Sequence, residues 1–427
     1  MSIPLDRLYH FINNIANEIY GDATVIIRPY PYGSKKIEDL TSLLYTPPDN
    51  FVSGFHVYCH DQEPLDYDEM LCAQSECKLI PFQILRNSLT PPTKSFPNIR
   101  RYANINDLAI LVHSEKRSIN LTQYQQDNFI PVYYWSHAVI ALDWFRFARH
   151  NKFTKNVKKV FLIYNRAWSG TREYRLKFID LLIDQQLIDR CQTSVNVIEP
   201  ELGIHYSQHR FKNPQWQPAH LLENHSTVNP TASYASADFD TTDYESTDVE
   251  VVLETLFDDG RLHLTEKSLR PIACGQPFIL VATPGSLEYL RDYGFKTYNT
   301  VWDESYDLIE NPQQRMGAIV DLMQSIAAWT PEVRVQKMQE TQIIADYNRQ
   351  HFFSSTFFNH VILELRDNFK SAVDIFNTKN TCQHYVNRWK ILLANQEMVD
   401  FLRNNNDSSF LSLDEIKNTL RIAEQKS

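Results

Sequence analysis

The sequence predicts an α/β protein with two domains, each built on a parallel β-sheet. Two observations lead to this fold class: apolar, strand-like runs alternate with helical segments, and polar clusters directly follow several of these runs. A length of 427 residues is sufficient for two domains and an appendage. We expect an N-terminal domain at 1–150, a basic linker at 151–159, a second domain at 160–330 and C-terminal helices at 331–427.

The composition is that of a folded protein and weighs against several functional classes. Hydrophobic residues make up 43% of the chain, and its 10 glycines are few for a protein of this length. This scarcity, together with the lack of a Walker or G-x-G-x-x-G motif, weighs against the common glycine-rich phosphate loops. The net charge of −10 weighs against a general nucleic-acid binder, because phosphate contacts dominate such affinity.

The sequence also lacks the usual signals for a metal site, a membrane segment or export. The six cysteines are scattered without paired zinc-like spacing, so we expect no metal, and free thiols in a reducing compartment. No apolar run approaches the ~20 residues that span a bilayer. The N-terminus, MSIPLDRLYHFINN, has polar residues where a signal peptide needs an apolar block. We therefore expect a cytoplasmic protein with no membrane partner.

Strand-like and helical segments follow one another in the first domain. Residues 3–20 place apolar side chains at helical spacing, which predicts an amphipathic helix. Two histidines after later strands, His113 and His137, are expected to be structural, with a place in the cleft as the alternative. The predicted strands are 23–30, the front of 51–65, 79–85, 108–112 and 130–135, and a helix follows at 138–150.

Three titratable residues, His60, Asp61 and Glu63, directly follow the strand in 51–65. In open α/β sheets, ligands bind at the carboxyl ends of the strands. Pro64 imposes an extended conformation on Glu63, which keeps this carboxylate out of a helix. We interpret the three residues as candidate catalytic groups, with a polar surface loop as the alternative.

A second polar loop follows the strand expected at 160–164, which opens the second domain. It contains Arg166, Ser169 and Arg172 and leads into a helix. The guanidinium fork of arginine matches pairs of phosphate oxygens, so this loop is a candidate anion site. Either arginine can fill this role. Ordinary charge on the surface of the following helix is sufficient to explain Arg175.

The most informative stretch is 249–290, which reads as strand, acidic turn, helix and strand, one βαβ unit. Thr265 is the expected N-cap of the helix, and N–H groups at a helix start favour an anion. Lys267 adds a positive charge, and Glu266 can accept hydrogen bonds from sugar hydroxyls. The unit therefore suits a sugar diphosphate; a capped helix with solvated charges is the alternative.

Thr265-Glu266-Lys267, followed by small residues, Gly275, Pro277 and an apolar strand, resembles a known donor-binding motif. The motif is that of GT-B glycosyltransferases, in particular the α1,3-fucosyltransferase-like family, in which a Glu-rich strand end precedes it. Glu254 stands at the corresponding strand end here. The segment is also similar to glycosyltransferases encoded by bacteriophages. Pro271 departs from the pattern and should kink or shorten the helix.

The resemblance covers roughly 51–65 and 160–310 and is specific around 254–285. It implies a GT-B fold, in which two Rossmann-like domains face each other across a cleft and the last helices cross back to the first domain. It also implies an inverting, metal-independent transfer of a sugar from a nucleotide-diphosphate sugar, with no further cofactor and with Glu63 as the base.

The acceptor implied by the resemblance is a hydroxyl group of a glycan or of a modified (hydroxymethylated) base in phage DNA. A phage-encoded chain would act in the cytoplasm of a bacterial host. A catalytically inactive GT-B module that binds a nucleotide or a carbohydrate is the remaining alternative.

Overall fold

The structure, a computed structural model, divides into two compact units. Unit 1 comprises Met1–Leu5 and His137–Val361, and unit 2 comprises Asp6–Ser136 and Ile362–Ser427. The chain passes from unit 2 to unit 1 between Ser136 and His137 and returns inside the helix α14 (Ser355–Lys379). The structure describes residues 3, 8–20, 25–29, 55–65, 109–126, 129–200, 202–220, 222–223, 225–228, 238–379 and scattered positions from 393 onward.

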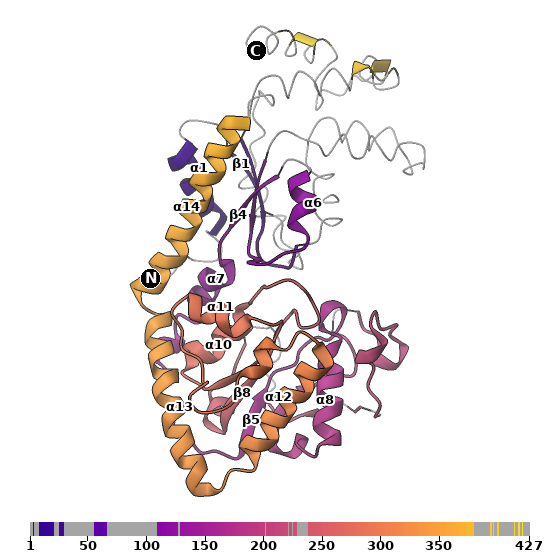
Figure 1. Cartoon of the computed structure of the whole chain (residues 1–427), viewed down its shortest axis with the longest axis vertical. Coiled ribbons are helices and arrows are strands. Elements are labelled where there is room, and N and C mark those ends of the chain that lie inside the picture. Colours follow the sequence, from indigo (N-terminus) through magenta and orange to yellow (C-terminus); the bar gives the residue numbers. More distant parts are fainter. Residues whose placement is uncertain are drawn as a thin grey trace. The chain divides into compact units, whose positions relative to one another are not determined.

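Unit 2 contains a parallel sheet in which the strands follow one another in chain order, β1-β2-β3-β4. Figure 1 shows α1 and the end of α14 on one side of this sheet and α6 on the other. An ion pair between Glu18 and Arg366 (2.8 Å) links α1 to α14. The elements of this unit are β1 (Val25–Pro29), β2 (Phe55–His60), β3 (Ala109–His113), β4 (Phe129–Tyr133), α1 (Leu8–Tyr20) and α6 (Leu121–Gln126).

Unit 1 contains a five-stranded sheet in the order β7-β6-β5-β8-β9. All its neighbouring strands are parallel except β7, which pairs antiparallel with β6 at one edge. Every residue of β8 and β9 is buried, as expected for strands covered on both faces. The strands are β5 (Lys159–Ile163), β6 (Cys191–Val195), β7 (His225–Ser226), β8 (Thr247–Leu253) and β9 (Phe278–Val281).

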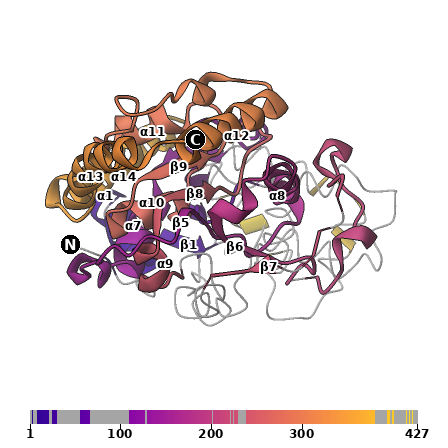
Figure 2. The same cartoon turned by 90° about the horizontal axis from the view of Figure 1, so that it is seen from below.

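Helices cover both faces of the sheet in unit 1. In Figure 2, α8 and α12 lie on one face, whereas α9 and α10 lie on the other. This arrangement is expected because parallel crossovers are nearly always right-handed, and β6 and β9 lie in opposite directions from the central pair β5 and β8. The helices are α7 (Ser136–Trp144), α8 (Tyr174–Asp184), α9 (Thr241–Glu245), α10 (Glu266–Cys274), α11 (Ser286–Asp292), α12 (Pro312–Ala327) and α13 (Pro331–Phe352), with the start of α14.

The predicted α/β class is confirmed, with parallel strands in both sheets and a fold compatible with two Rossmann-like domains. Thr265 is the N-cap of α10 as predicted, and Gly275 (φ 67°) follows the helix as a left-handed C-cap. The helix continues through Pro271 to Cys274, so this proline does not end it. Residues 295–298, which follow α11 (Ser286–Asp292), form no strand. The strand expected at 79–85 lies outside the described residues.

The segment expected to be a linker, 151–159, belongs to unit 1. The backbone N–H groups of Asn156 and Lys158 donate to the carbonyls of Glu245 and Ser246, both at 2.8 Å. These contacts fasten the segment to the residues that lead into β8. The division of the chain at Ser136 and His137 therefore precedes the expected linker.

Candidate functional site

The connections of the sheet in unit 1 diverge at the central strands β5 and β8. From β5 the chain continues through α8 to β6, whereas from β8 it continues through α10 to β9 at the other edge. The two strands pair directly, with Phe161 opposite Val249. In open α/β sheets, ligands bind at such a switch point, beyond the carboxyl ends of the strands. The loops after β5 and β8, with the start of α10, therefore form the candidate site.

The residues predicted for donor binding all lie in this region. Arg166, Ser169 and Arg172 follow β5, and Glu254 follows β8. The remaining three begin α10. They are Thr265, Glu266 and Lys267.

Arg175 connects the loops after the two central strands, which corrects the expectation of an ordinary surface charge. Its side chain is buried in α8 (2% exposed). One terminal nitrogen donates to the carbonyl of Ala167 (2.7 Å), and the other donates to the carbonyls of Leu253 (2.8 Å) and Glu254 (3.0 Å). Burial lowers the pKa of this guanidinium. Arg175 thus fixes the spacing of the two loops.

The carboxylate of Glu254 caps the start of α10. Glu254 is fully buried. Its Oε1 accepts hydrogen bonds from the backbone N–H groups of Thr265 (3.1 Å) and Ser268 (3.2 Å), and from the Ser268 hydroxyl. Its Oε2 accepts one from the Thr265 hydroxyl (2.7 Å). These donors and the positive end of the helix stabilise a charge that is otherwise costly to bury.

This arrangement corrects the expected role of the helix start. The sequence predicted that backbone N–H groups in the first turn of α10 receive the diphosphate. Those of Thr265 and Ser268 bind the protein's own carboxylate, and that of Lys267 faces the Thr265 hydroxyl (3.4 Å). The backbone N–H groups of Thr265 and Ser268 are therefore engaged within the protein, and the ammonium of Lys267 is the cation at this helix start.

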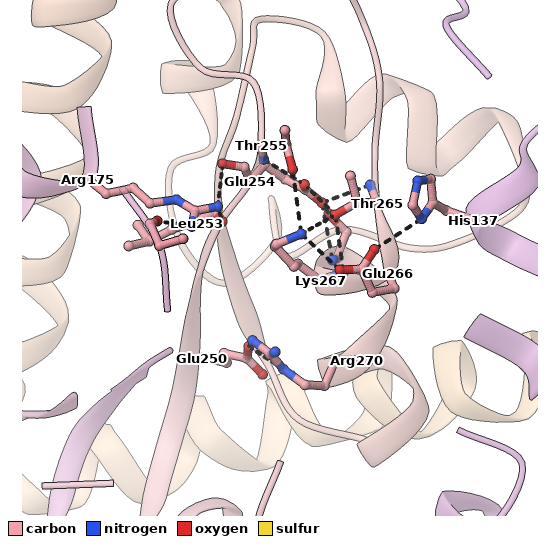
Figure 3. A network of polar contacts seen from close by, with 12 residues as sticks. His137, Arg175, Glu250, Leu253, Glu254, Thr255, Thr265, Glu266, Lys267 and Arg270 are labelled. Atoms are coloured by element: carbon pink, nitrogen blue, oxygen red, sulfur yellow. Dashed lines mark hydrogen bonds and ion pairs between the residues drawn. The ribbon is translucent and has the colours of Figure 1, made fainter. Parts of the chain in front are cut away.

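Figure 3 shows Glu266 between two nitrogen-bearing partners, Lys267 and His137. Its Oε1 lies 2.8 Å from Nζ of Lys267, and its Oε2 lies 3.0 Å from Nδ1 of His137. The Lys267 ammonium also contacts the hydroxyls of Thr265 (3.2 Å) and Thr255 (3.5 Å). Lys267 is the most exposed of the three residues, with 13% of its side-chain surface accessible.

Burial disfavours the charged form of Glu266, yet its pKa lies well below the usual range. Lys267 and His137 cause this, because their charge and hydrogen bonds stabilise the carboxylate more than burial destabilises it. Glu266 is therefore ionised at neutral pH, with both oxygens engaged. Binding a sugar hydroxyl, its expected role, requires the exchange of one of these partners.

The loop after β5 is held by residues that follow β6. Glu199 is fully buried, and its Oε2 accepts hydrogen bonds from the backbone N–H groups of Ser169 and of the preceding residue, both at 2.8 Å. Asn196 donates to the carbonyl of Arg166 (3.3 Å). The backbone of this loop is thus fixed, whereas the side chains of Arg166 and Arg172 are only half-buried.

The candidate catalytic residues of unit 2 lie at the carboxyl end of β2. His60 ends this strand, and both His60 and Asp61 are fully buried. The Asp61 carboxylate accepts a hydrogen bond from the Tyr134 hydroxyl, and the Asp61 carbonyl accepts one from the Ser136 hydroxyl. Asp61 therefore anchors the loop. Glu63 is half-buried, which makes it the most accessible of the three candidates.

Two residues of the site differ from the sequence-based expectation, Arg175 and His137. Arg175 lies one turn before Ile179 and two turns before Leu182, which form the buried face of α8. This apolar spacing is a signal that it points inward. His137 has no such signal, because its partner Glu266 is distant in the sequence and comes close only in the folded unit.

No protein-family model, curated protein or solved structure gives a significant match to this chain. In the part of the chain that the structure describes, no three His, Cys, Asp or Glu side chains gather as a potential metal site. No described helix is both long enough and apolar enough to cross a bilayer.

Proposed function

We propose that this chain is a glycosyltransferase that moves a sugar from a nucleotide-diphosphate sugar to an acceptor hydroxyl. One observation carries the proposal: Lys267 presents its ammonium beside the switch point, on a helix start that Glu254 holds in place. The arginines in the neighbouring loop support it. So does the resemblance of 265–279 to the donor motif of the GT-B fucosyltransferase-like family, and we propose the GT-B fold on the same ground.

In the proposed mechanism, Lys267 and either Arg166 or Arg172 bind the two phosphates of the donor. Negative charge grows on the diphosphate as its bond to the anomeric carbon breaks. Fixed cations stabilise this charge, each typically by a few kcal/mol. Glu63 accepts the proton of the acceptor hydroxyl during the attack. A single displacement inverts the anomeric centre, and these cations take the place of a metal.

We propose a glycan as the acceptor. The alternative, a modified base in phage DNA, is motivated by the basic segment 146–159. Part of this segment serves the fold, because Nζ of Lys155 donates to the carbonyls of Tyr244 and Thr247, each at 2.8 Å. Fewer cations then remain for phosphate contacts, which dominate affinity for DNA. Salt-sensitive retention on duplex DNA would favour the alternative.

Thermal unfolding with a panel of nucleoside diphosphates and nucleotide sugars, with and without EDTA, tests the proposal. A ligand at a hundredfold excess over its Kd stabilises by about 2.7 kcal/mol, which shifts the melting temperature visibly. A shift with one nucleotide, together with transfer or slow hydrolysis of its sugar, supports a transferase. Binding without turnover indicates an inactive binding module. No shift with any compound contradicts the proposal.

A further inference from the structure

We propose that His137 is a positioning residue that acts through Glu266 to keep the ammonium of Lys267 available for the donor diphosphate. The inference rests on the proposed function, which it extends to a residue outside the donor motif. It concerns the chain of contacts from His137 to Glu266 (3.0 Å) and from Glu266 to Lys267 (2.8 Å).

The geometry of Glu266 is the first argument. Its two carboxylate oxygens have different partners, with Lys267 on Oε1 and His137 on Oε2. A carboxylate that faces a lysine alone can offer both oxygens and neutralise the ammonium. Because His137 engages one oxygen, Glu266 holds Lys267 from one side only. Glu266 is buried (4% of its side chain exposed), so little solvent screens these interactions.

The rigidity of His137 is the second argument. It lies in the first turn of α7, where Ala138, Val139 and Ile140 are buried. The ring of His263 packs edge-on against the imidazole, with 5.1 Å between centroids and an interplanar angle of 85°. The imidazole is thus fixed from two sides, and through it the carboxylate of Glu266.

The surroundings of the Lys267 ammonium are the third argument. An ammonium has three donors, and its oxygen neighbours are Glu266 (2.8 Å), Thr265 (3.2 Å) and Thr255 (3.5 Å). The longest contact, to Thr255, is the one that a phosphate oxygen would replace at the least cost. The ammonium can then bind the donor while Glu266 keeps it in place.

The test measures the affinity for the nucleoside diphosphate identified by the thermal panel, and for the corresponding nucleoside, by titration calorimetry. We expect His137→Leu to weaken diphosphate binding roughly five- to tenfold, a typical coupling between contacting groups. Nucleoside affinity should stay unchanged, because the nucleoside has no phosphate for Lys267. His137→Asn, whose amide can replace the Nδ1 contact, should restore most of the affinity.

Two further variants separate positioning from general destabilisation. His220→Leu removes another imidazole–carboxylate contact, that of His220 Nδ1 with Asp180 (2.7 Å), and should leave diphosphate affinity unchanged. In a Lys267→Met background, His137→Leu should have no further effect on affinity. If His137→Leu does not fold, His137→Ala replaces it in the comparison with His137→Asn.

Each outcome bears on the inference. Equal diphosphate affinity in wild type and His137→Leu overturns the inference and leaves the proposed function intact. An equal loss for nucleoside and diphosphate also overturns it, since it indicates a structural role. No nucleotide binding by the wild type overturns the proposed function and the inference together.

Discussion

The carboxylate of Glu254 binds Thr265 twice, through the backbone N–H (3.1 Å) and through the side-chain hydroxyl (2.7 Å). Glu254 directly follows β8, and Thr265 is the N-cap of α10. The relationship joins the end of a buried strand to the start of the helix that carries Lys267. Its consequence is that the candidate site is held in place without a ligand.

Replacing this carboxylate should destabilise the fold. We expect Glu254→Gln to lower the free energy of unfolding by about 1–3 kcal/mol. The amide lacks the negative charge that the helix start favours. Its NH2 group would also face N–H and O–H groups that now donate to the carboxylate. Urea denaturation measures this. Glu288→Gln, at an exposed carboxylate in the first turn of α11, is the control and should change stability by less than about 0.5 kcal/mol. Equal effects of the two substitutions would show that Glu254 is not a structural cap.

Arg175 should matter more to stability than any surface arginine. Arg175→Met leaves the carbonyls of Ala167, Leu253 and Glu254 without this donor, and we expect a loss of about 3 kcal/mol or more. Arg190→Met, at an exposed arginine, is the matched control. Urea denaturation of both variants decides the point, and similar midpoints would contradict the role assigned to Arg175.

Asp307 should make stability depend on pH between about 4 and 6. Its Oδ2 accepts a hydrogen bond from the backbone N–H of Leu287 (3.1 Å) in the first turn of α11, and burial raises its pKa to about 6. A carboxyl with a raised pKa in the folded state contributes stability below its unfolded pKa, 3.8, and this contribution is lost as pH rises through 6. The stability of wild type relative to Asp307→Asn should therefore fall from pH 4 to pH 7, by at most roughly 3 kcal/mol. A difference that is constant with pH would contradict the shift.

Two glycines should respond in opposite ways to alanine. Gly294 lies two residues after the end of α11 with φ +87°, and a Cβ there would lie 2.8 Å from Nε2 of His351. Gly317 lies inside α12, where a Cβ would meet nothing within 4 Å outside its own helix, so alanine adds helix propensity at no steric cost. We expect Gly294→Ala to lower the melting temperature and Gly317→Ala to raise it, the latter by roughly 0.5–1 kcal/mol of stability. Thermal unfolding of the two variants gives both signs in one experiment.

Local rules predicted much of unit 1. The apolar runs of this unit became β5, β8 and β9, and the N-cap Thr265 followed from its residue type. The pairing of β5 with β8 could not be predicted in this way, because strand order depends on long-range contacts.

The same limit explains the errors at the site. Local spacing suggested an open helix start at α10, but Glu254 folds back to fill it. The partner of His137 is equally distant in the sequence, and only the folded unit brings Glu266 to it. Single-residue propensity has no information on such contacts.

The most direct test of the proposed function is the affinity of wild type and Lys267→Met for nucleoside diphosphates, measured by titration calorimetry. Lys337→Met, at a helix-surface ion pair with Glu340 (3.0 Å), is the control. We predict that one nucleoside diphosphate binds wild type and the control alike, and that Lys267→Met weakens it at least about tenfold, the loss of one charge-assisted contact. The melting temperature without ligand should fall for Lys267→Met and not for the control, because the buried Glu266 carboxylate loses its ammonium partner. Equal affinity of Lys267→Met and wild type, or no binding by wild type, would contradict a donor site at Lys267.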